Sequence, residues 1–473
     1  MLQSASPFST PHGGSHLPVF DLLGIGFGPS NLALAVALRE MLPQDSAFRF
    51  GFLEKKPGFV WHGNMLLDNS RMQISFLKDL VTMRNPASRY TFINYLHARQ
   101  RLQDFINTKT FFPSRHEFND YLSWVAADFA DACHYGEEVV SITPEAGQGE
   151  PGADILRVVS RMSDGAVVER RARNVVVSVG GVPNVPRPFE AWQGNARVFH
   201  SSNYLGALGQ LHDVRRVAVI GSGQSAAEIF LDLHGRDSAV AVDLISRAPA
   251  LKPADDSPFV NEIFNPGYTD YHFSRDAAER EALLRSFGNT NYAVVDTDLI
   301  ETIYDVLYQQ KVTGMARHRL LAGCEARHAE ADADGVRVDI VRNEDGSHEL
   351  QRYDAVILAT GYRRELHQAL LKPLAPFLDA DTGFEADREY RLKTTPACGA
   401  GVFLQGCCEA THGLSDTLLS VLAIRAQEIA SAVIAHGSAH GSAHDAADIG
   451  NAQAPRRTQA VRWEGQLARA GSH

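Results

Sequence analysis

Apolar and glycine-rich segments near the start of the chain follow one another as a strand, a turn, a helix and a second strand. Residues 20–23 are an apolar run of strand length, and residues 24–29, GIGFGP, form a glycine turn. Residues 32–38 are apolar on every side, which is typical of a helix buried against a sheet. The second strand, 48–53, ends at Glu54. This order predicts a βαβ unit whose turn and helix N-terminus can cradle a pyrophosphate, although a plain strand–turn–helix would give the same pattern.

The same pattern recurs in the middle of the chain. Residues 217–220 are an apolar strand that leads into a second glycine turn, GSGQSAAE at 221–228, and a helix. The next strand, 240–245, ends beside Arg247 and not beside an acid. A carboxylate at this point binds a free ribose hydroxyl, whereas an arginine accommodates a 2′-phosphate. We therefore assign the first unit to FAD through Glu54 and the second to NADPH through Arg247, for which a plain surface arginine is the alternative.

The remaining pattern predicts how these units are connected. Short strands at 139–142 and 155–159 indicate a meander, and the connection 57–113 is long enough to predict a functional role. Asp298 and Glu301 have the spacing of a capping box, and residues 418–434 predict a long apolar helix. The predicted parts are a flexible arm (1–17), an FAD-binding domain (18–210), an NADPH-binding domain (211–353) with a substrate-binding insertion (about 255–310), a return segment of the FAD-binding domain (354–435) and a disordered tail (436–473). The glycine break at 180–183 and the segment 359–362 are predicted crossings between the domains.

Composition narrows the classes of function. The 473 residues carry a net charge of −11, which argues against nucleic acid as a partner. The five cysteines form no CxxC pair, which favours a reducing compartment and argues against a zinc site. No apolar stretch reaches the roughly 18 residues of a membrane helix. The prediction is a cytoplasmic α/β protein without a membrane span or a bound metal.

Five further stretches are distinctive: GFGPSNLALA (26–35), MQISFLKDLVTMRNP (72–86), SPFVNEIF (257–264), TNYAVVD (290–296) and HGLSDTLLSVLA (412–423). They resemble one family of flavoproteins, the microbial L-ornithine N5-monooxygenases of hydroxamate siderophore synthesis, which are relatives of the lysine N6-hydroxylases. The resemblance extends over residues 19–434. It implies an α/β fold with two Rossmann-like dinucleotide-binding domains, one for FAD and one for NADPH, and a small, mainly helical substrate-binding insertion.

The resemblance also implies roles for individual residues, with Gln73 beside the isoalloxazine and Val139 at the adenine end. The FAD-binding residues are Gly24, Gly26, Gly28, Pro29, Glu54, Gln73, Val139, His412, Gly413 and Leu414. The substrate-binding residues are Lys78, Asn261, Asn291 and Ser415. The NADPH-binding residues are Gly221, Ser222, Gly223, Gln224, Ser225, Arg247, Asn291, Tyr292 and Ala293.

The substrate residues suit a zwitterionic amino acid with a cationic side chain. Lys78 supplies a compact positive charge for the carboxylate, and the amides of Asn261 and Asn291 can donate and accept without repelling an ammonium. Simpler interpretations exist: a surface lysine for Lys78, turn or capping residues for the two asparagines, a bond to a buried backbone group for Gln73, and a helix N-cap for Ser415.

The reaction implied by the resemblance begins with the reduction of FAD by NADPH. The reduced flavin adds O₂ to form a C4a-hydroperoxide, whose distal oxygen passes to the neutral side-chain amine of L-ornithine and gives N5-hydroxyornithine. No catalytic side chain is assigned beyond the flavin, with Gln73 and Asn291 the first candidates to support it. The resemblance further implies a homo-oligomer, a dimer or tetramer, and a product that passes to a siderophore acyltransferase or a non-ribosomal peptide synthetase.

Other functions remain open from the sequence. L-lysine or another primary amine differs from ornithine by little, since one methylene in a pocket is worth only about 1–3 kcal/mol. A Baeyer–Villiger or flavin-containing monooxygenase carries a linker motif, FxGxxxHxxxW or FxGxxxHSxxY, that residues 192–201 do not match. A disulfide reductase needs a CxxC or CxxxxC pair, which the sequence lacks. A flavin-binding scaffold without activity would not need both Arg247 and the set of Lys78, Asn261 and Asn291.

Overall fold

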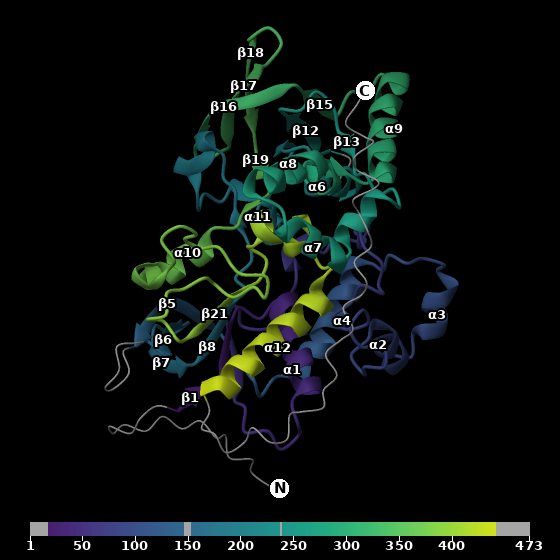
Figure 1. Ribbon diagram of the computed structural model, residues 1–473. Coiled ribbons are helices and arrows are strands. Elements are labelled where there is room, and N and C mark those ends of the chain that lie inside the picture. The colour runs from purple at the N-terminus through teal and green to yellow at the C-terminus, as the bar shows by residue number, and fades with distance from the viewer. Residues whose placement is uncertain (1–17, 146–152, 237–238, 441–473) are drawn as a thin grey trace.

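The computed structural model describes residues 18–145, 153–236 and 239–440. The predicted arm, 1–17, and the tail beyond 440 lie outside the described residues. Residues 436–440, predicted as the beginning of a disordered tail, are helical, because helix α12 runs from Leu422 to His440. Two Rossmann units lie one above the other, with helix α7 of the insertion between them (Figure 1).

The first unit is a sheet of parallel strands in the order β21-β8-β2-β3-β4. Its strands β2, β8 and β21 are buried throughout, as expected for a parallel sheet covered on both faces. Helix α1 follows the glycine turn after β2, and α12 packs beside α1 (Figure 1). The elements are β2 (Leu22–Ile25), α1 (Pro29–Met41), β3 (Phe50–Glu54), β4 (Cys133–Tyr135), β8 (Asn174–Val177) and β21 (Gly401–Leu404). The predicted βαβ unit is confirmed.

The second unit has the strand order β10-β19-β11-β12-β15, again parallel. Its helices α6 and α9 pack on one face through Ile229, Phe230 and Ile303. The elements are β10 (Val198–His200), β11 (Arg216–Ile220), α6 (Gln224–Arg236), β12 (Ala241–Ser246), α9 (Thr297–Thr313), β15 (Arg319–Ala322) and β19 (Ala355–Leu358). The second predicted unit is confirmed as well.

Both glycine turns pass against the end of a neighbouring strand in the same way. Gly26 has φ +82°, and a Cβ there would lie 2.4 Å from the carbonyl oxygen of Ser178. Gly221 has φ +149°, and a Cβ there would lie 2.3 Å from the carbonyl oxygen of Ala359. Only a residue without a side chain fits either position, so the two units share one solution to the strand–helix turn.

Antiparallel strands extend each unit. The predicted meander is confirmed as β5, β6 and β7, with the short β1 paired in parallel to β7. A second meander, β16, β17 and β18, lies in the chain between β15 and β19 of the second sheet. The bounds are β1 (Val19–Phe20), β5 (Glu137–Glu145), β6 (Ile155–Met162), β7 (Val167–Ala172), β16 (Cys324–Ala331), β17 (Val336–Arg342) and β18 (His348–Tyr353).

The chain crosses between the units at β9 (Val182–Pro183) and β20 (Tyr362–Arg363), which pair with each other. The predicted crossing segment 180–183 contains β9, and the predicted segment 359–362 ends at the first residue of β20. The predicted divisions at 211 and 354 are displaced from them, because β10 and β19 both belong to the second sheet. We therefore propose domain boundaries near 182 and 362.

Short helices fill the connections. The long connection carries η1 (Gly63–Met65), α2 (Phe92–Ala98) and α3 (Leu102–Asn107), and α4 (Arg115–Ala127) follows it. The insertion is helical, as predicted, with η4 (Val260–Phe264), α7 (Pro266–Phe273), α8 (Ala277–Phe287), η5 (Gly288–Thr290) and the strand pair β13 (Lys252–Pro253) and β14 (Val294–Val295). The other short helices are η2 (Arg187–Trp192), η3 (Ser201–Asn203), α5 (Tyr204–Leu208), α10 (Leu366–Leu371), η6 (Lys372–Phe377), α11 (Glu409–His412) and η7 (Leu414–Thr417).

Two local predictions are wrong. The capping box of Asp298 and Glu301 does not form, because α9 begins at Thr297 with Asp296 as its N-cap residue. The helix predicted from 418 begins at Leu422, because Leu418 is extended after the η7 turn. In both cases the apolar or acidic spacing is compatible with several helix starts, and the backbone of the preceding turn decides among them.

Candidate functional site

A cavity of about 2130 Å³ lies between the two units. Much of its lining comes from parts of the segments 61–78, 220–228, 254–264, 290–299 and 407–420. A pocket for one drug-sized ligand measures roughly 300–1,000 Å³, so this cavity has room for more than one such molecule. The cavity therefore brings together the long connection, the second glycine turn, the insertion and the return segment.

All the residues predicted to bind NADPH line this cavity. Gly223, in the glycine turn, would place a Cβ 3.5 Å from the Cα of Ala293, so two predicted segments far apart in sequence meet here. Ala293 has φ +56°, a strained conformation for a residue with a side chain, and such strain gathers at functional sites.

Arg247 follows β12 and is exposed at the edge of the cavity. Among the described residues, no carboxylate forms an ion pair with its guanidinium. An unpaired guanidinium beside a phosphate-binding turn is free to take a 2′-phosphate in bidentate fashion.

Lys78 is half-buried and lines the same cavity. Burial lowers the pKa of its ammonium group. The carboxylate of the neighbouring Asp79 is bound elsewhere: it accepts the backbone N–H groups of Val81 at 2.9 Å and Phe92 at 2.7 Å. Lys78 thus presents a positive charge that no carboxylate among the described residues pairs with.

Asn261 and Asn291 also line the cavity, on the insertion. The Asn261 Nδ2 group donates to the carbonyl oxygen of Asp256 at 2.8 Å, so the turn interpretation holds for one of its N–H bonds. Within the described part of the chain, its Oδ1 atom and second N–H have no hydrogen-bond partner. Asn291 directly follows η5. The structure therefore gathers Lys78 and both asparagines around one space.

Ser415 is completely buried in η7, and its Oγ atom has no hydrogen-bond partner among the described residues. The N-cap interpretation of Ser415 is wrong, because α12 begins only at Leu422. Ser415 does not line the cavity, although Thr417 and Leu418 do. Burying a hydroxyl without a hydrogen-bond partner costs about 1–3 kcal/mol. A buried group that lacks a partner is expected where a bound ligand supplies the missing hydrogen bond.

Of the predicted FAD residues, Gln73 alone lines this cavity, and Gly24, Gly26, Gly28, Pro29 and Glu54 lie where β2 passes into α1 and where β3 ends. Gly28 is the N-cap residue and Pro29 the first helical residue, and no side chain caps the helix. The Glu54 carboxylate accepts the backbone N–H of Phe27 at 2.8 Å, which fixes the turn against the end of β3. Gly24 has a packing role, since a Cβ there would lie 2.2 Å from the Phe52 ring. Val139 is buried on β5.

Gln73 lines the cavity and its Nε2 atom donates to Asp296 Oδ1 at 2.8 Å. The alternative in which Gln73 satisfies a buried backbone group is therefore wrong: its amide binds a carboxylate on the other unit. This contact joins residues 223 positions apart in the chain, and no local sequence pattern predicts it.

The segment His412–Leu414 does not line the cavity. The His412 ring stacks on Tyr390, with 4.0 Å between ring centroids, and its Nδ1 atom lies 2.8 Å from Thr411 Oγ1. Burial lowers the pKa of His412 to about 4. The side chain of Leu414 packs with Ile263 in the insertion core. The side chains of His412 and Leu414 thus serve internal packing.

Several cavity residues were missed by the sequence prediction. Burial lowers the pKa of His62 to about 4, and the cations Arg115, Lys56 and Arg364 add to this effect. His62, Arg115 and Arg364 line the cavity. Arg115 is paired with Glu228 at 2.7 Å and the lowered pKa of about 4 leaves His62 uncharged near neutral pH, so Arg364 is the one of the three that adds positive charge to this end of the cavity. Arg364 lies two residues after the predicted crossing segment 359–362, and this position was the sequence signal that could have found it.

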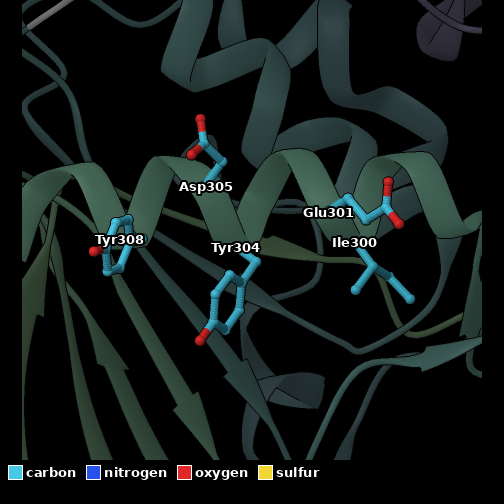
Figure 2. A pocket seen from close by; sticks show the side chains of 5 residues that line it. All are labelled: Ile300, Glu301, Tyr304, Asp305 and Tyr308. Atoms are coloured by element: carbon cyan, nitrogen blue, oxygen red, sulfur yellow. The ribbon is translucent and has the colours of Figure 1, made fainter.

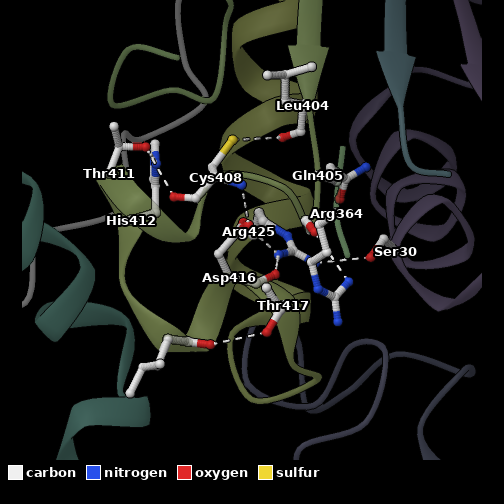
Figure 3. A network of polar contacts seen from close by, with 12 residues as sticks. Ser30, Arg364, Leu404, Gln405, Cys408, Thr411, His412, Asp416, Thr417 and Arg425 are labelled. Carbon is white, nitrogen blue, oxygen red and sulfur yellow. Dashed lines mark hydrogen bonds and ion pairs between the residues drawn. The ribbon is translucent and has the colours of Figure 1, made fainter. Parts of the chain in front are cut away.

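Arg425 was also missed, although an arginine within the apolar run 418–434 is itself unusual. It is 1% exposed and pairs with the buried Asp416 at 3.0 Å, and its second nitrogen donates to Ser30 Oγ at 3.0 Å (Figure 3). The backbone N–H of Cys408 donates to the other oxygen of Asp416 at 2.6 Å. This network joins the return segment to the first turn of α1, where the predicted FAD residues lie.

A second, shallower hollow of about 420 Å³ lies on the outer face of α9 (Figure 2). Its lining includes Tyr304 and Tyr308, which are 73% and 52% exposed. No residue predicted to bind a cofactor or substrate lies in it. Across the described part of the chain, no cluster of His, Cys, Asp or Glu has a metal-binding arrangement, and no helix has the length and apolar character to cross a bilayer.

Comparison with known proteins gives a consistent result. Residues 18–364 match the family described as L-lysine 6-monooxygenase/L-ornithine 5-monooxygenase. The L-ornithine N(5)-monooxygenase of Pseudomonas aeruginosa is 51% identical over 422 residues, which are 88% of this chain and 94% of the relative.

Solved structures agree. The ornithine N-hydroxylase of Kutzneria sp. 744, with reduced FAD, NADP⁺ and L-ornithine, superimposes with a TM-score of 0.83 at 39% identity, covering 88% of this chain and 99% of that one. The L-lysine 6-monooxygenase of Pseudomonas syringae gives a TM-score of 0.76 at 34% identity, covering 88% and 99%. With the fold, the two glycine turns and the matched length in agreement, the chain belongs to the L-lysine 6-monooxygenase/L-ornithine 5-monooxygenase family.

Proposed function

We propose that the protein catalyses the FAD- and NADPH-dependent N-hydroxylation of the side-chain amine of L-ornithine by O₂, giving N5-hydroxyornithine. The observation that carries this proposal is the shared cavity, in which Lys78, Asn261 and Asn291 face the same space as the second glycine turn and Arg247. A cavity that combines side chains suited to an amino acid with side chains suited to a dinucleotide is typical of an enzyme that binds both.

The residues present fit a bound FAD. The α1 N-terminus has no side-chain cap, and the turn before it tolerates no Cβ at Gly26, so backbone N–H groups are open to a pyrophosphate. Glu54 would bind the ribose, and Gln73 would lie on the cavity side. When bound, FAD supplies the activation of O₂ and the transfer of its oxygen, and the protein supplies binding, orientation and the exclusion of water.

The protein's own residues orient the amino acid. Lys78 binds the α-carboxylate as a charge-assisted donor, and Asn261 and Asn291 bind the backbone groups. Ser415 is buried three residues before the cavity-lining Leu418, and we propose that it reaches toward the side chain when the substrate is bound. A free alkylammonium has a pKa near 10.4, so the site must favour loss of this proton before the amine can accept oxygen.

L-ornithine is favoured over L-lysine by the relative that is 51% identical, while the lysine enzyme described above is 34% identical. L-lysine remains the second candidate, because the shape of the cavity does not discriminate between two side chains that differ by one methylene. A homo-oligomer, a cytoplasmic location and transfer of the product to a siderophore acyltransferase or a non-ribosomal peptide synthetase remain proposals, the first tested by light scattering after size-exclusion chromatography.

The test uses purified, FAD-loaded protein with NADPH and air. L-ornithine, L-lysine and cadaverine are supplied in parallel, and the hydroxylamine product is measured with NADPH consumption. We expect hydroxylated ornithine in near-stoichiometric ratio to NADPH, and at least tenfold lower kcat/KM for lysine. A higher kcat/KM for lysine than for ornithine would make L-lysine the proposed substrate. If none of the three amines gives a hydroxylamine, the proposal is refuted.

A further inference from the structure

Asp296 occupies a helix N-cap position but does not cap the helix. An Asp at this position normally accepts an N–H of the first helical turn, which is worth about 1 kcal/mol. No such bond reaches the Asp296 side chain. Instead, the backbone N–H of Leu299 is taken by Asp298 Oδ1 at 2.9 Å and by the backbone oxygen of Asp296 at 3.1 Å. The Asp296 carboxylate is therefore left for another purpose.

Both carboxylate oxygens of Asp296 are bound by glutamine amides from different units. Gln73, on the first unit, donates to Oδ1 at 2.8 Å, and Gln224, the first residue of α6, donates to Oδ2 at 2.8 Å. The backbone N–H of Asp296 donates in return to Gln224 Oε1 at 2.9 Å. The reciprocal pair fixes the orientation of the Gln224 amide directly beside the phosphate-binding turn.

The network crosses between the units a second time. Gln224 Nε2 also donates to Glu228 Oε1 at 3.0 Å. Glu228 accepts both terminal nitrogens of Arg115, on the first unit, at 2.7 and 2.9 Å. Five side chains thus form one continuous path that leaves the first unit at Arg115 and returns to it at Gln73, with Asp296 in the last link.

We propose that Asp296 is a positioning residue that holds Gln73 and the turn 221–225 in a fixed relation, so that the flavin and nicotinamide sites stay in register. The inference rests on the proposed function in taking that turn to bind NADPH and Gln73 to face the flavin. A carboxylate is required because both partners are donors, whereas an asparagine offers one acceptor. Hydride transfer is sensitive to such a relation, since about 1 Å of misplacement costs roughly 100-fold in rate.

The first test measures hydride transfer without the amine. FAD-loaded Asp296→Asn protein is mixed anaerobically with NADPH in a stopped-flow instrument. We expect the limiting rate constant of flavin reduction to fall at least fivefold, with FAD content and the affinity for 2′,5′-ADP within twofold of wild type. Asp305→Asn, the same change on the exposed face of α9, should leave all three within twofold. A smaller fall in Asp296→Asn, or loss of FAD or 2′,5′-ADP binding, would overturn the proposal.

The second test asks whether Asp296 acts through Gln73. In a double-mutant cycle, flavin reduction in the double variant Gln73→Ala/Asp296→Asn should be no more than twofold slower than in the slower of the two single variants. If the double variant instead loses the product of the two single effects, the residues act independently and the link is overturned.

Hydrogen–deuterium exchange of the cofactor-free protein adds a readout independent of turnover. Residues 70–75 should exchange at least fivefold faster in Asp296→Asn and unchanged in Asp305→Asn; equal protection in all proteins would overturn the proposal. No assay here contains ornithine, so failure of the hydroxylation proposal leaves these results interpretable.

Discussion

The buried ion pair between Arg425 and Asp416 allows a quantitative test of what holds the FAD-binding unit together. Both side chains are at most 1% exposed. Replacing Arg425 by methionine, which has a similar length and no charge, removes the 3.0 Å ion pair and the bond to Ser30. Asp416 then keeps the backbone N–H of Cys408 as a hydrogen-bond donor and loses its charge partner.

The magnitude follows from this uncompensated charge. Removal of one partner of a buried pair costs about 3–5 kcal/mol. For a domain of 150–250 residues, each kcal/mol lowers the Tm by about 2–4 °C, so Arg425→Met should lower it by roughly 6–20 °C. On heating, Arg425→Met should also release its flavin, seen as a rise in flavin fluorescence, at a lower temperature than wild type, because the network ends at the first turn of α1.

Two comparisons make the assay specific. The double variant Asp416→Asn/Arg425→Met carries no buried charge, so its Tm should lie above that of Arg425→Met alone. Arg285→Met removes an exposed pair with Glu281, 72% and 70% exposed, and should shift the Tm by less than about 2 °C. A fall of under 3 °C for Arg425→Met, or a double variant less stable than the single, would refute the reasoning.

Four further variants test the predicted substrate and cofactor sites. Lys78→Ala should raise the KM for ornithine about 10- to 150-fold, the equivalent of one charge-assisted bond of about 1.5–3 kcal/mol, with unchanged flavin content; an unchanged KM would remove the carboxylate role. Because burial lowers the pKa of Lys78, its charge is lost as pH rises through a value below the usual one, so ornithine binding should weaken at alkaline pH in wild type and less in Lys78→Arg. Arg247→Ala should raise the KM for NADPH at least tenfold more than that for NADH, and equal effects would exclude a 2′-phosphate contact. Gly26→Ala should yield protein with less than a tenth of the wild-type FAD content, measured by absorbance, whereas full flavin loading would show that the turn accepts a Cβ.

Local patterns predicted the parts of the structure that neighbouring residues determine. Both βαβ units could be predicted because the sequence pattern of a buried strand, a glycine turn and a helix lies within one short stretch of consecutive residues. The family resemblance placed Lys78, Asn261 and Asn291, and the structure brings them to one cavity. These three residues come from segments far apart in the chain, and their spacing alone indicates no common site.

Contacts between distant segments were beyond the sequence. The link from Gln73 to Asp296 depends on how the two units face each other, and the stacking of His412 on Tyr390 depends on the return segment. Helix starts were also uncertain, because Asp296 and Asp298 are both acceptable N-cap residues and the preceding strand β14 selects the first. The displaced domain boundaries have the same origin: membership of β10 in the second sheet is a matter of pairing, not of composition.

The edge strand β21 has a consequence for synthesis on the ribosome. It pairs with β8, yet roughly 220 residues separate Val177 from Gly401, and α12, which packs on α1, comes later still. At about 5–20 residues per second, the amino-terminal unit waits about 10–45 s for its last strand, while the second unit already has all its strands once Leu358 has emerged. The second unit can therefore complete its sheet during synthesis before the first unit does. A chain truncated before β21 would leave the sheet of the flavin-binding unit without its edge strand.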